Sequence, residues 1–324
     1  MLYALIVTAL IFDFFNGFND SASIVATAIA SRAMSPRRAL VITAVSQFLG
    51  PFLFGVAVAT TVGKGLVEPH AVTLPVGLSG VLAAIIWNRV TWMLAVPSSS
   101  SHALIGGLIG AVLLSGGINS IHADGLIKVL LALFIAPPLG FILGFIVLRF
   151  LFFLAHDTSP QINFMFRHGQ MFTCIALGLS HGTNDSQKTM GIITLGLVSA
   201  GLLPTIEVPL WVIVASAGAI SLGTLLGGWR LIRTVGGKIF TVRPVHGFTA
   251  HIASTIVILG AALLGGPVST TQVISSTLMG AGAGERVSKV RWGVAQEMLW
   301  AWGLTIPAAM IVGAGLLWVI NLVV

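Results

Sequence analysis

Long uncharged apolar segments recur along the whole chain, and they restrict the possible fold more than any other feature. The runs 40–61, 130–148, 208–229 and 298–324 contain no Asp, Glu, Lys or Arg. Each is close to or above the roughly 20 residues that an α-helix needs to cross a bilayer. Only 8% of all residues are charged, against roughly a quarter in soluble domains, so a water-soluble fold is excluded. The sequence therefore predicts an all-α polytopic membrane protein.

Matching segments divide the chain into two related halves. The matches are NGFNDS at 16–21 with HGTNDS at 181–186, TVG at 61–63 with TVG at 234–236, and Pro97 before SSSSH with Pro267 before VSTTQ. Their separations are 165, 173 and 170 residues, and ordered matches at such similar separations indicate one duplicated unit. The predicted repeats are residues 1–155 and 171–324, joined by a linker at 156–170.

The positions of Lys and Arg indicate that the two halves have opposite orientations, because short cytoplasmic loops are enriched in these residues. The first-half loop 32–38 is basic, whereas the corresponding loop 200–207 has neither Lys nor Arg. The loops 63–70 and 114–124 carry only Lys64. Their counterparts hold Arg230, Arg233, Lys238, Arg243, Arg286, Lys289 and Arg291. We therefore predict inverted repeats of about five crossings each in the cytoplasmic (inner) membrane. The linker is predicted to be cytoplasmic, and both termini are predicted to lie on the outer side of this membrane.

Polar residues interrupt the first and fourth spans of each half, where a helix in contact with lipid would be apolar. In the segment 12–24, Asn, Asp and Ser stand between apolar flanks, and these residue types cap new helix starts. At 97–102 and 267–272, Pro ends the incoming chain before Ser and Thr open a helix. Irregular backbone at membrane depth has to line a protein cavity. We therefore predict broken first spans and re-entrant helical hairpins in both halves.

Four helix N-termini that converge between the halves would form an anion site. Their free backbone N–H groups and the positive ends of their dipoles would point at one place. Amide and hydroxyl donors around that place suit a tetrahedral oxyanion with several acceptor oxygens. The candidate anion ligands are Asn19, Ser99, Ser100, Ser101, Asn184, Ser269, Thr270 and Thr271.

Asp20 and Asp185 would repel such an anion, and each carboxylate costs roughly 3 kcal/mol or more near the bilayer centre. Sodium ions or protons would resolve the conflict by neutralising the carboxylates. The membrane potential acts in the same direction, since each negative charge that enters an inside-negative cell costs ~2.3 kcal/mol per 100 mV. The sequence therefore predicts symport of an anion with Na⁺ or H⁺. The candidate cation ligands are Asp20, Asp185, Asn16, Ser21 and Ser186.

Four further ionisable residues are candidates for proton or charge partners, and each also has a structural interpretation. Lys188 lies one helical turn after Asp185, so it either pairs with that carboxylate or attracts the anion. His102 and His181 are either hydrogen-bonded structural imidazoles or members of a proton path. Glu297 begins the last long span, where it either makes an interhelical hydrogen bond or takes part directly.

These motifs resemble those of the PiT family of inorganic phosphate transporters. The GFND and HGTNDSQKTMGII segments, the PSSSSHALIGGLIGA and PVSTTQ segments and the closing VRWGVAQEMLWAWGLTIPAA follow the family's order over essentially the whole chain. The resemblance implies cation-coupled import of inorganic phosphate across the lipid bilayer by two inverted repeats, and often a homodimer. It also implies that the Asn–Asp motifs and the Ser/Thr hairpin tips hold substrate and cation. Gln272 departs from the family pattern, in which many members have His.

Other functions are compatible with parts of this pattern. A sulfate permease of the same fold would bind an oxyanion of the same shape, and an anion channel would use similar amide donors. An intramembrane hydrolase would use Asp20 and Asp185 as a proton-sharing dyad, but it explains neither the hydroxyl clusters nor the repeat, so we predict no enzyme. With the single cysteine Cys174 and no CxxC or His-rich cluster, we predict neither a structural metal nor a cofactor. The net charge of +7 lies in connecting loops, where it sets orientation rather than binding nucleic acid.

Overall fold

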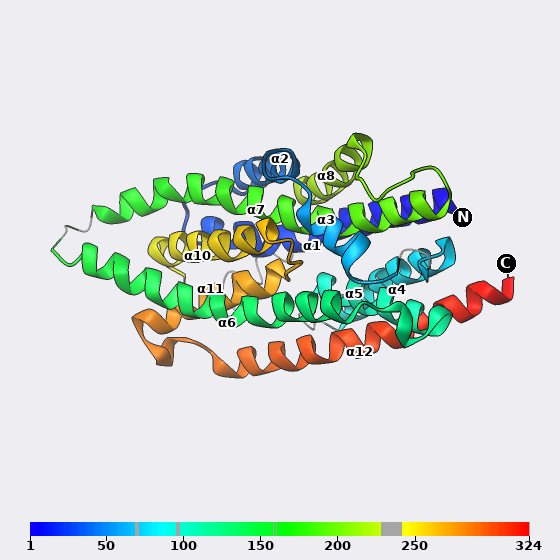
Figure 1. Ribbon diagram of the computed structural model, residues 1–324. Helices are drawn as coiled ribbons and strands as arrows, with labels where there is room; N and C mark the ends of the chain where they lie inside the picture. The colour runs from blue at the N-terminus through cyan, green and yellow to red at the C-terminus, as the bar shows by residue number, and fades with distance from the viewer. Residues whose placement is uncertain (69–70, 95–97, 158, 160, 228–241, 324) are drawn as a thin grey trace.

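The computed structural model describes residues 1–68, 71–94, 98–157, 159, 161–227 and 242–323. Within these residues the chain is helical, with one isolated β-bridge between Val67 and Ile121, and the helices form an elongated bundle (Figure 1). The elements are α1 (Leu2–Ala30), α2 (Pro36–Phe54), α3 (Ala57–Thr60), the π-helix η1 (Thr61–Gly65), α4 (Leu74–Met93), α5 (Ser100–Gly116), the 3₁₀ turn η3 (Ile118–Ser120), α6 (Ala123–Leu154), α7 (Ile162–Ser199), α8 (Leu210–Leu225), α10 (Pro244–Leu263), α11 (Thr270–Glu285), the 3₁₀ turn η4 (Val287–Lys289) and α12 (Trp292–Val323). The predicted all-α fold is confirmed.

Several of the described helices have the length and apolarity of membrane spans. Helices α1, α4, α6, α10 and α12 are each long and apolar enough to cross a bilayer. Helix α2 is followed by a turn of 69° into the segment 57–65, and the two together form one bent apolar unit. Gly55 stands at this turn with φ = 79°, a backbone conformation that favours glycine. The chain is therefore a multi-pass integral membrane protein, whereas the count of about ten crossings stays a prediction.

Helices α1 and α7 pass through the two Asn–Asp motifs without a break, so the predicted broken first spans are wrong. Asn, Asp and Ser favour helix caps when only local chemistry decides. Here the Ser21 hydroxyl donates to the carbonyl of Phe18 and the Ser186 hydroxyl to that of Gly182, each within its own helix. An unbroken helix also keeps its backbone groups hydrogen-bonded at membrane depth. Of the four predicted helix N-termini, only those of α5 and α11 remain.

Two helical hairpins, α4–α5 and α10–α11, carry the Ser/Thr clusters. Helix α5 begins at Ser100 and α11 at Thr270, each directly after a serine in extended conformation, so the predicted helix starts are confirmed. Helix α5 packs against α12, and α11 packs against α6. The second helix of each hairpin thus contacts the long last helix of the other half. Some features used in the sequence analysis lie outside the described part of the chain, namely Pro97, Arg230, Arg233, Lys238 and the segment 234–236.

Glycines within the Asn–Asp motifs let helices of opposite halves meet backbone to backbone. Gly17 of α1 lies against the backbone of Ile220 in α8, and Gly182 of α7 lies against the backbone of Gln47 in α2, with no room for a methyl group at either glycine. Gly17 and Gly182 are 165 residues apart, and their partners Gln47 and Ile220 are 173 residues apart. Two of the sequence matches have the same separations. These contacts fix the depth at which α1 and α7 carry their motifs. The inverted orientation of the halves stays a prediction.

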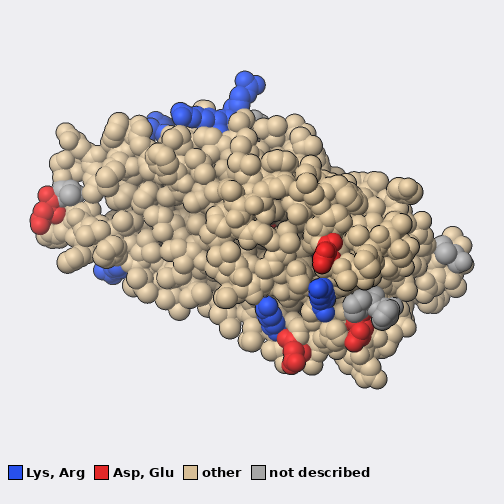
Figure 2. Space-filling view, turned by 45° about the horizontal axis from the view of Figure 1, so that its top comes forward, with Lys and Arg blue, Asp and Glu red and all other residues tan. Residues whose placement is uncertain are grey.

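Both chain termini lie at one end of the molecule, and the connection from α6 to α7 lies at the opposite end (Figure 1). Helix α7 begins at Ile162, so residues 162–170 of the predicted linker are helical. At this end the Arg167 guanidinium donates to the carbonyl of Arg32 at 2.6 Å, which joins α7 to the turn after α1. Most of the face drawn in Figure 2 carries neither acidic nor basic side chains, as expected of a surface in contact with lipid.

Candidate substrate and cation site

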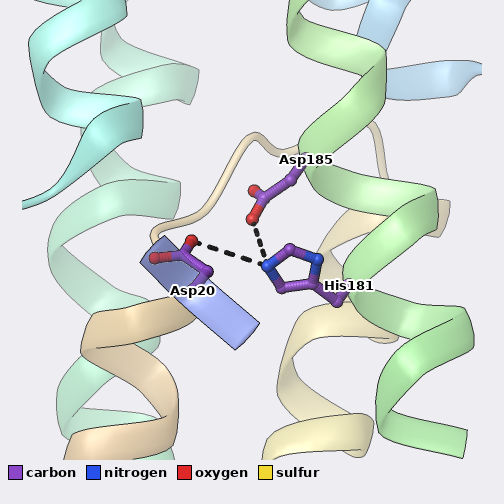
Figure 3. Close-up of side chains that lie close together, drawn as sticks. All are labelled: Asp20, His181 and Asp185. Atoms are coloured by element: carbon purple, nitrogen blue, oxygen red, sulfur yellow. Dashed lines mark ion pairs between the residues drawn. The ribbon is translucent and has the colours of Figure 1, made fainter. Parts of the chain in front are cut away.

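Asp20 of α1 and His181 and Asp185 of α7 meet in the interior of the protein (Figure 3). One ligand atom from each residue lies within 4.8 Å of the others. His181 Nε2 is 2.9 Å from an Asp185 carboxylate oxygen and 3.5 Å from a carboxylate oxygen of Asp20. All three residues are buried. One carboxylate from each predicted repeat therefore contributes to a single centre.

Helix geometry and one glutamine orient the imidazole of this centre. His181, Asp185 and Lys188 share one face of α7, because residues three and four apart are neighbours on a helix. The side-chain amide of Gln47 in α2 lies 2.9 Å from His181 Nδ1. This contact fixes the orientation of the ring, which turns Nε2 toward the two carboxyl groups.

The tip of the α10–α11 hairpin supplies hydroxyl donors to both carboxylates. Thr270 Oγ1 donates to Asp185 Oδ2 at 2.6 Å and lies 3.4 Å from Asp20 Oδ2. Thr271 Oγ1 donates to Asp20 Oδ1 at 2.7 Å. Hydrogen bonds to charged acceptors are stronger than those between neutral groups. The first turn of α11 is therefore firmly joined to both α1 and α7.

Lys188 completes the centre, and its side chain is only 1% exposed. Its ammonium contacts the Asp185 carboxylate, donates to Ser101 Oγ at 2.6 Å and donates to the carbonyl of Val268 at 2.8 Å. These three acceptors match the three protons of an ammonium group. Ser101 belongs to the first turn of α5, and Val268 precedes α11. One side chain of α7 thus contacts the tips of both hairpins.

The ammonium of Lys188 compensates only one of the two carboxyl groups, because it contacts Asp185. Asp20 has the imidazole of His181 as its nearest basic neighbour in the described part of the chain. Uncompensated buried charge is strongly unfavourable, so the centre favours the arrival of a proton or a small cation. Asp20, His181 and Asp185 present the ligand atoms that could hold such an ion.

Comparison with known proteins identifies the family. A profile of the phosphate transporter family matches residues 16–313. The chain belongs to this family. It is 42% identical over 325 residues to a probable low-affinity inorganic phosphate transporter of Bacillus subtilis (strain 168), covering 98% of this chain and 97% of the relative. The corresponding protein of Rhizobium meliloti (strain 1021) is also 42% identical, over 316 residues, covering 97% of this chain and 95% of the relative.

A solved structure of a sodium-dependent phosphate transporter has the same fold, with a TM-score of 0.89 and 25% identity, covering 100% of this chain and 99% of that chain. Membership of the phosphate transporter family confirms the resemblance carried by the sequence motifs. The relatives are transporters, so the prediction of a transporter rather than an enzyme is also confirmed.

Asn184, predicted to bind the anion, holds the second hairpin in place. Its Nδ2 donates to the carbonyl of Gly266 at 3.0 Å, and its Oδ1 accepts from the N–H of Val268 at 3.1 Å. Both ends of the side-chain amide are therefore engaged by the backbone just before α11. This arrangement positions Thr270 and Thr271 over the carboxylates.

The first hairpin is held by a different set of side-chain contacts. Ser100 Oγ donates to Asn16 Oδ1 at 2.7 Å, which joins α5 to α1. Ser99 caps α5 by accepting from the backbone N–H of His102 at 3.2 Å. His102 Nδ1 accepts from the side-chain amide of Gln272 at 2.9 Å, so the residue that departs from the family pattern links α5 to α11.

Other predicted site residues lie outside the network of side-chain contacts. Among the described residues, the side chains of Asn19 and Ser269 make no hydrogen bond. Ser21 and Ser186 bond to carbonyls of their own helices. Glu297 is exposed on α12, and the structure does not bring it to the centre.

Sequence reasoning missed the role of Gln187. Its Oε1 accepts from the backbone N–H groups of Val58 and Ala59 at 2.8 and 3.2 Å, and its Nε2 donates to the carbonyl of Gly55 at 2.6 Å. It thereby satisfies the free backbone groups where the chain bends after α2. The available signal was its place in the second Asn–Asp motif, because a polar side chain inside a membrane helix usually has a buried partner.

Proposed function

We propose that this protein is a secondary active transporter that imports inorganic phosphate in symport with a cation. The supporting observation is the buried centre in which Asp20 and Asp185 share an imidazole, an ammonium and the hydroxyls of a hairpin tip. Carboxylates repel an anion until a cation neutralises them, and the surrounding donors suit phosphate oxygens. The relatives named above are inorganic phosphate transporters, which supports phosphate over sulfate.

In this proposal Lys188 serves as a tethered cation beside Asp185. Its three oxygen contacts occupy a position that a mobile cation would otherwise take. Among the described residues, the one basic group within ion-pair distance of Asp20 is the imidazole of His181, whose Nε2 lies 3.5 Å away. The mobile coupling cation therefore binds at Asp20, next to His181 and Asp185. Both Na⁺ and H⁺ fit this role, and one solved relative is a sodium-dependent transporter.

Coupling then follows from competition for hydroxyl donors. Thr270 and Thr271 donate to the carboxylates in this structure. Each hydroxyl has one proton, so it cannot serve a carboxylate and a phosphate oxygen at once. A cation bound at the carboxylates releases the hydroxyls to phosphate, and the N-terminus of α11 adds its positive dipole end. Phosphate binding in this scheme requires the cation.

We further propose that the end with the α6–α7 connection faces the cytoplasm and that both termini face outside, in the cytoplasmic membrane. Arg32, Arg37 and Arg38 follow α1, and Arg167 lies near the start of α7 at that end. Basic residues are enriched on the cytoplasmic side of membrane proteins. The predicted homodimer stays a prediction.

Uptake of labelled phosphate into proteoliposomes, driven separately by sodium and pH gradients, tests the proposed function. Asp20→Asn and Asp185→Asn should each abolish concentrative uptake while the protein remains inserted in the membrane, because each removes a carboxylate that holds the cation. Asp157→Asn provides a matched control, since its side chain is 95% exposed in the α6–α7 connection.

Three outcomes would contradict the proposal. Full activity of either centre variant would remove the cation site from Asp20 and Asp185. Uptake that persists after both gradients are collapsed would indicate a channel. Equal accumulation of sulfate, with sulfate and phosphate competing equally, would indicate a general oxyanion permease.

A further inference from the structure

A third carboxylate lies in the same helix as Asp20 and takes no part in the centre described above. Asp13 precedes Asp20 by two helical turns, roughly 10 Å along the same face of α1. Its side chain is 0% exposed in the interior of the protein. The proposed transport mechanism leaves this buried acid unexplained.

Asp13 has one hydrogen-bond donor and an unsatisfied oxygen. Thr189 Oγ1 of α7 donates to Asp13 Oδ2 at 2.5 Å. Asp13 Oδ1 is buried with no hydrogen-bond partner among the described residues. Ser216 of α8 faces the same carboxylate, and its hydroxyl is also buried without a partner in the described part of the chain. Two unsatisfied polar atoms from different helices therefore point into one buried site.

The charged groups around Asp13 do not supply a counter-ion. Asp185 and Lys188 of α7 face it, but they contact each other and so carry little net charge as a pair. Helix α8 contains no ionisable residue. Arg89 of α4 lies over the ring of Phe15, 4.2 Å from its centroid. An ionised Asp13 would therefore be an uncompensated charge at membrane depth, which is strongly unfavourable.

We propose that Asp13 is a proton-binding site of the transport cycle, whose protonated carboxyl accepts from Thr189 and donates to Ser216. Protonation removes the buried charge and gives both unsatisfied atoms a partner. A proton is favoured over a metal cation because the described site offers only the carboxylate and two hydroxyls. The Thr189 hydroxyl also lies 2.9 Å from the carbonyl of Ser186 in its own helix, so it is already engaged. Hard metal cations such as Ca²⁺ and Mg²⁺ take about six or more oxygen ligands.

The position of Asp13 links its proton to the centre. The Thr189 bond joins α1 to α7, and the contact between Asp20 and His181 joins the same two helices two turns away. Loss of the proton would leave an uncompensated negative charge buried in the interface between α1 and α7. Separation of α1 from α7 and release of the proton therefore favour each other. This inference rests on the proposed symport, because net proton movement requires a transport cycle.

The test uses the full chain in proteoliposomes with an imposed gradient of one pH unit. Asp13→Asn keeps the shape and neutrality of a protonated carboxyl, so phosphate binding and phosphate–phosphate exchange should persist. The steady-state accumulation of phosphate should fall about tenfold, since each coupled proton contributes a factor of ten per pH unit. The matched control is Asp124→Asn, an exposed acid in the first turn of α6, which should behave as wild type.

Difference infrared spectra recorded across pH give a second readout that does not depend on transport. The wild type should show a protonated-carboxyl band that Asp13→Asn lacks and that Ser216→Ala shifts in frequency. Wild-type accumulation of phosphate by Asp13→Asn would overturn the proposal, and so would a protonated-carboxyl band that is unchanged in this variant. The proposal would also fail if Asp13→Asn lost the response to a sodium gradient rather than the response to the pH gradient. If the wild type shows no cation-driven uptake, the proposed function fails, and the infrared band still decides whether Asp13 binds the proton.

Discussion

Replacing Gly106 by alanine should separate the first hairpin from its support, and the structure gives the size of the shift. A Cβ at Gly106 of α5 would lie 2.7 Å from the carbonyl oxygen of Ile306 in α12 and 3.1 Å from the Cβ of Ala309. The oxygen belongs to the backbone, so it cannot rotate away. Ordinary van der Waals contact begins at 3.4 Å, which requires α5 to move by about 0.7 Å because overlap on this scale is repulsive.

A shift of this size disturbs the contacts at the first turn of α5. Ser101 donates to the carbonyl of Val268 at 2.9 Å and accepts from Lys188 at 2.6 Å. Lengthened by the full shift, the first of these bonds would exceed the 3.5 Å limit for a hydrogen bond. We expect overpacking to cost roughly 1–3 kcal/mol of stability and the uptake rate to fall about tenfold or more, since small displacements of binding groups have large effects.

Thermal unfolding of the purified protein and phosphate uptake into proteoliposomes measure the two effects of Gly106→Ala. Gly303 of α12 provides the matched control, because a Cβ there has no atom within 4 Å. Gly303→Ala should be neutral or stabilising by about 0.5–1 kcal/mol, since alanine favours helix more than glycine. Wild-type stability and uptake in Gly106→Ala would refute the reasoning. Equal losses in Gly106→Ala and Gly303→Ala would show that the effect comes from replacing a glycine, whether or not the new Cβ meets a neighbouring helix.

Three further predictions concern single contacts. Lys188→Gln should lower the free energy of unfolding by roughly 3–5 kcal/mol, because it removes the ammonium that pairs with the buried Asp185. Thermal unfolding should show that part of this stability is recovered when Asp185→Asn is added to Lys188→Gln. Thr271→Val should raise the phosphate concentration for half-maximal uptake about 10- to 100-fold, the equivalent of a hydrogen bond to a charged group, and Thr271→Ser should restore it. The hydrogen bond with Glu68 raises the pKa of His122 above 6.5 at the start of α6. Because the folded-state pKa is the higher one, the pair stabilises the protein fully below pH 6.5 and loses this effect as pH rises through the raised pKa. The Tm difference between wild type and Glu68→Gln should shrink over that range.

Local chemistry made the hairpin helices predictable. A proline followed by Ser and Thr both ends an incoming segment and caps a new helix, and α5 and α11 begin at those residues. The carboxylates of Asp20 and Asp185 were also identifiable, because an acid in an apolar span needs a partner. Their convergence required the additional inference that the two motifs belong to one duplicated unit.

The unbroken course of α1 and α7 could not be read from residue types. Asn16, Asn19, Asp20 and Ser21 favour caps in isolation, but their helix is held by contacts with other helices, such as that of Ser100 with Asn16. Tertiary contacts of this kind override local preference. The same holds for Asn184, whose amide serves the hairpin backbone rather than facing a ligand.

Hydrogen bonds at the centre join elements that an alternating-access motion would have to separate. Thr271 connects α11 to Asp20 on α1, Thr270 connects α11 to Asp185 on α7, and Lys188 connects α7 to the tip of α5. Breaking three hydrogen bonds that each involve a charged group costs several kcal/mol in total, at roughly 1.5–3 kcal/mol each. A cation at Asp20 and phosphate at the hydroxyls would replace part of these contacts on the moving elements. Cation or phosphate alone leaves some of these groups unpaired, so in our proposal movement is favoured only when both have bound, and this condition makes the coupling obligatory.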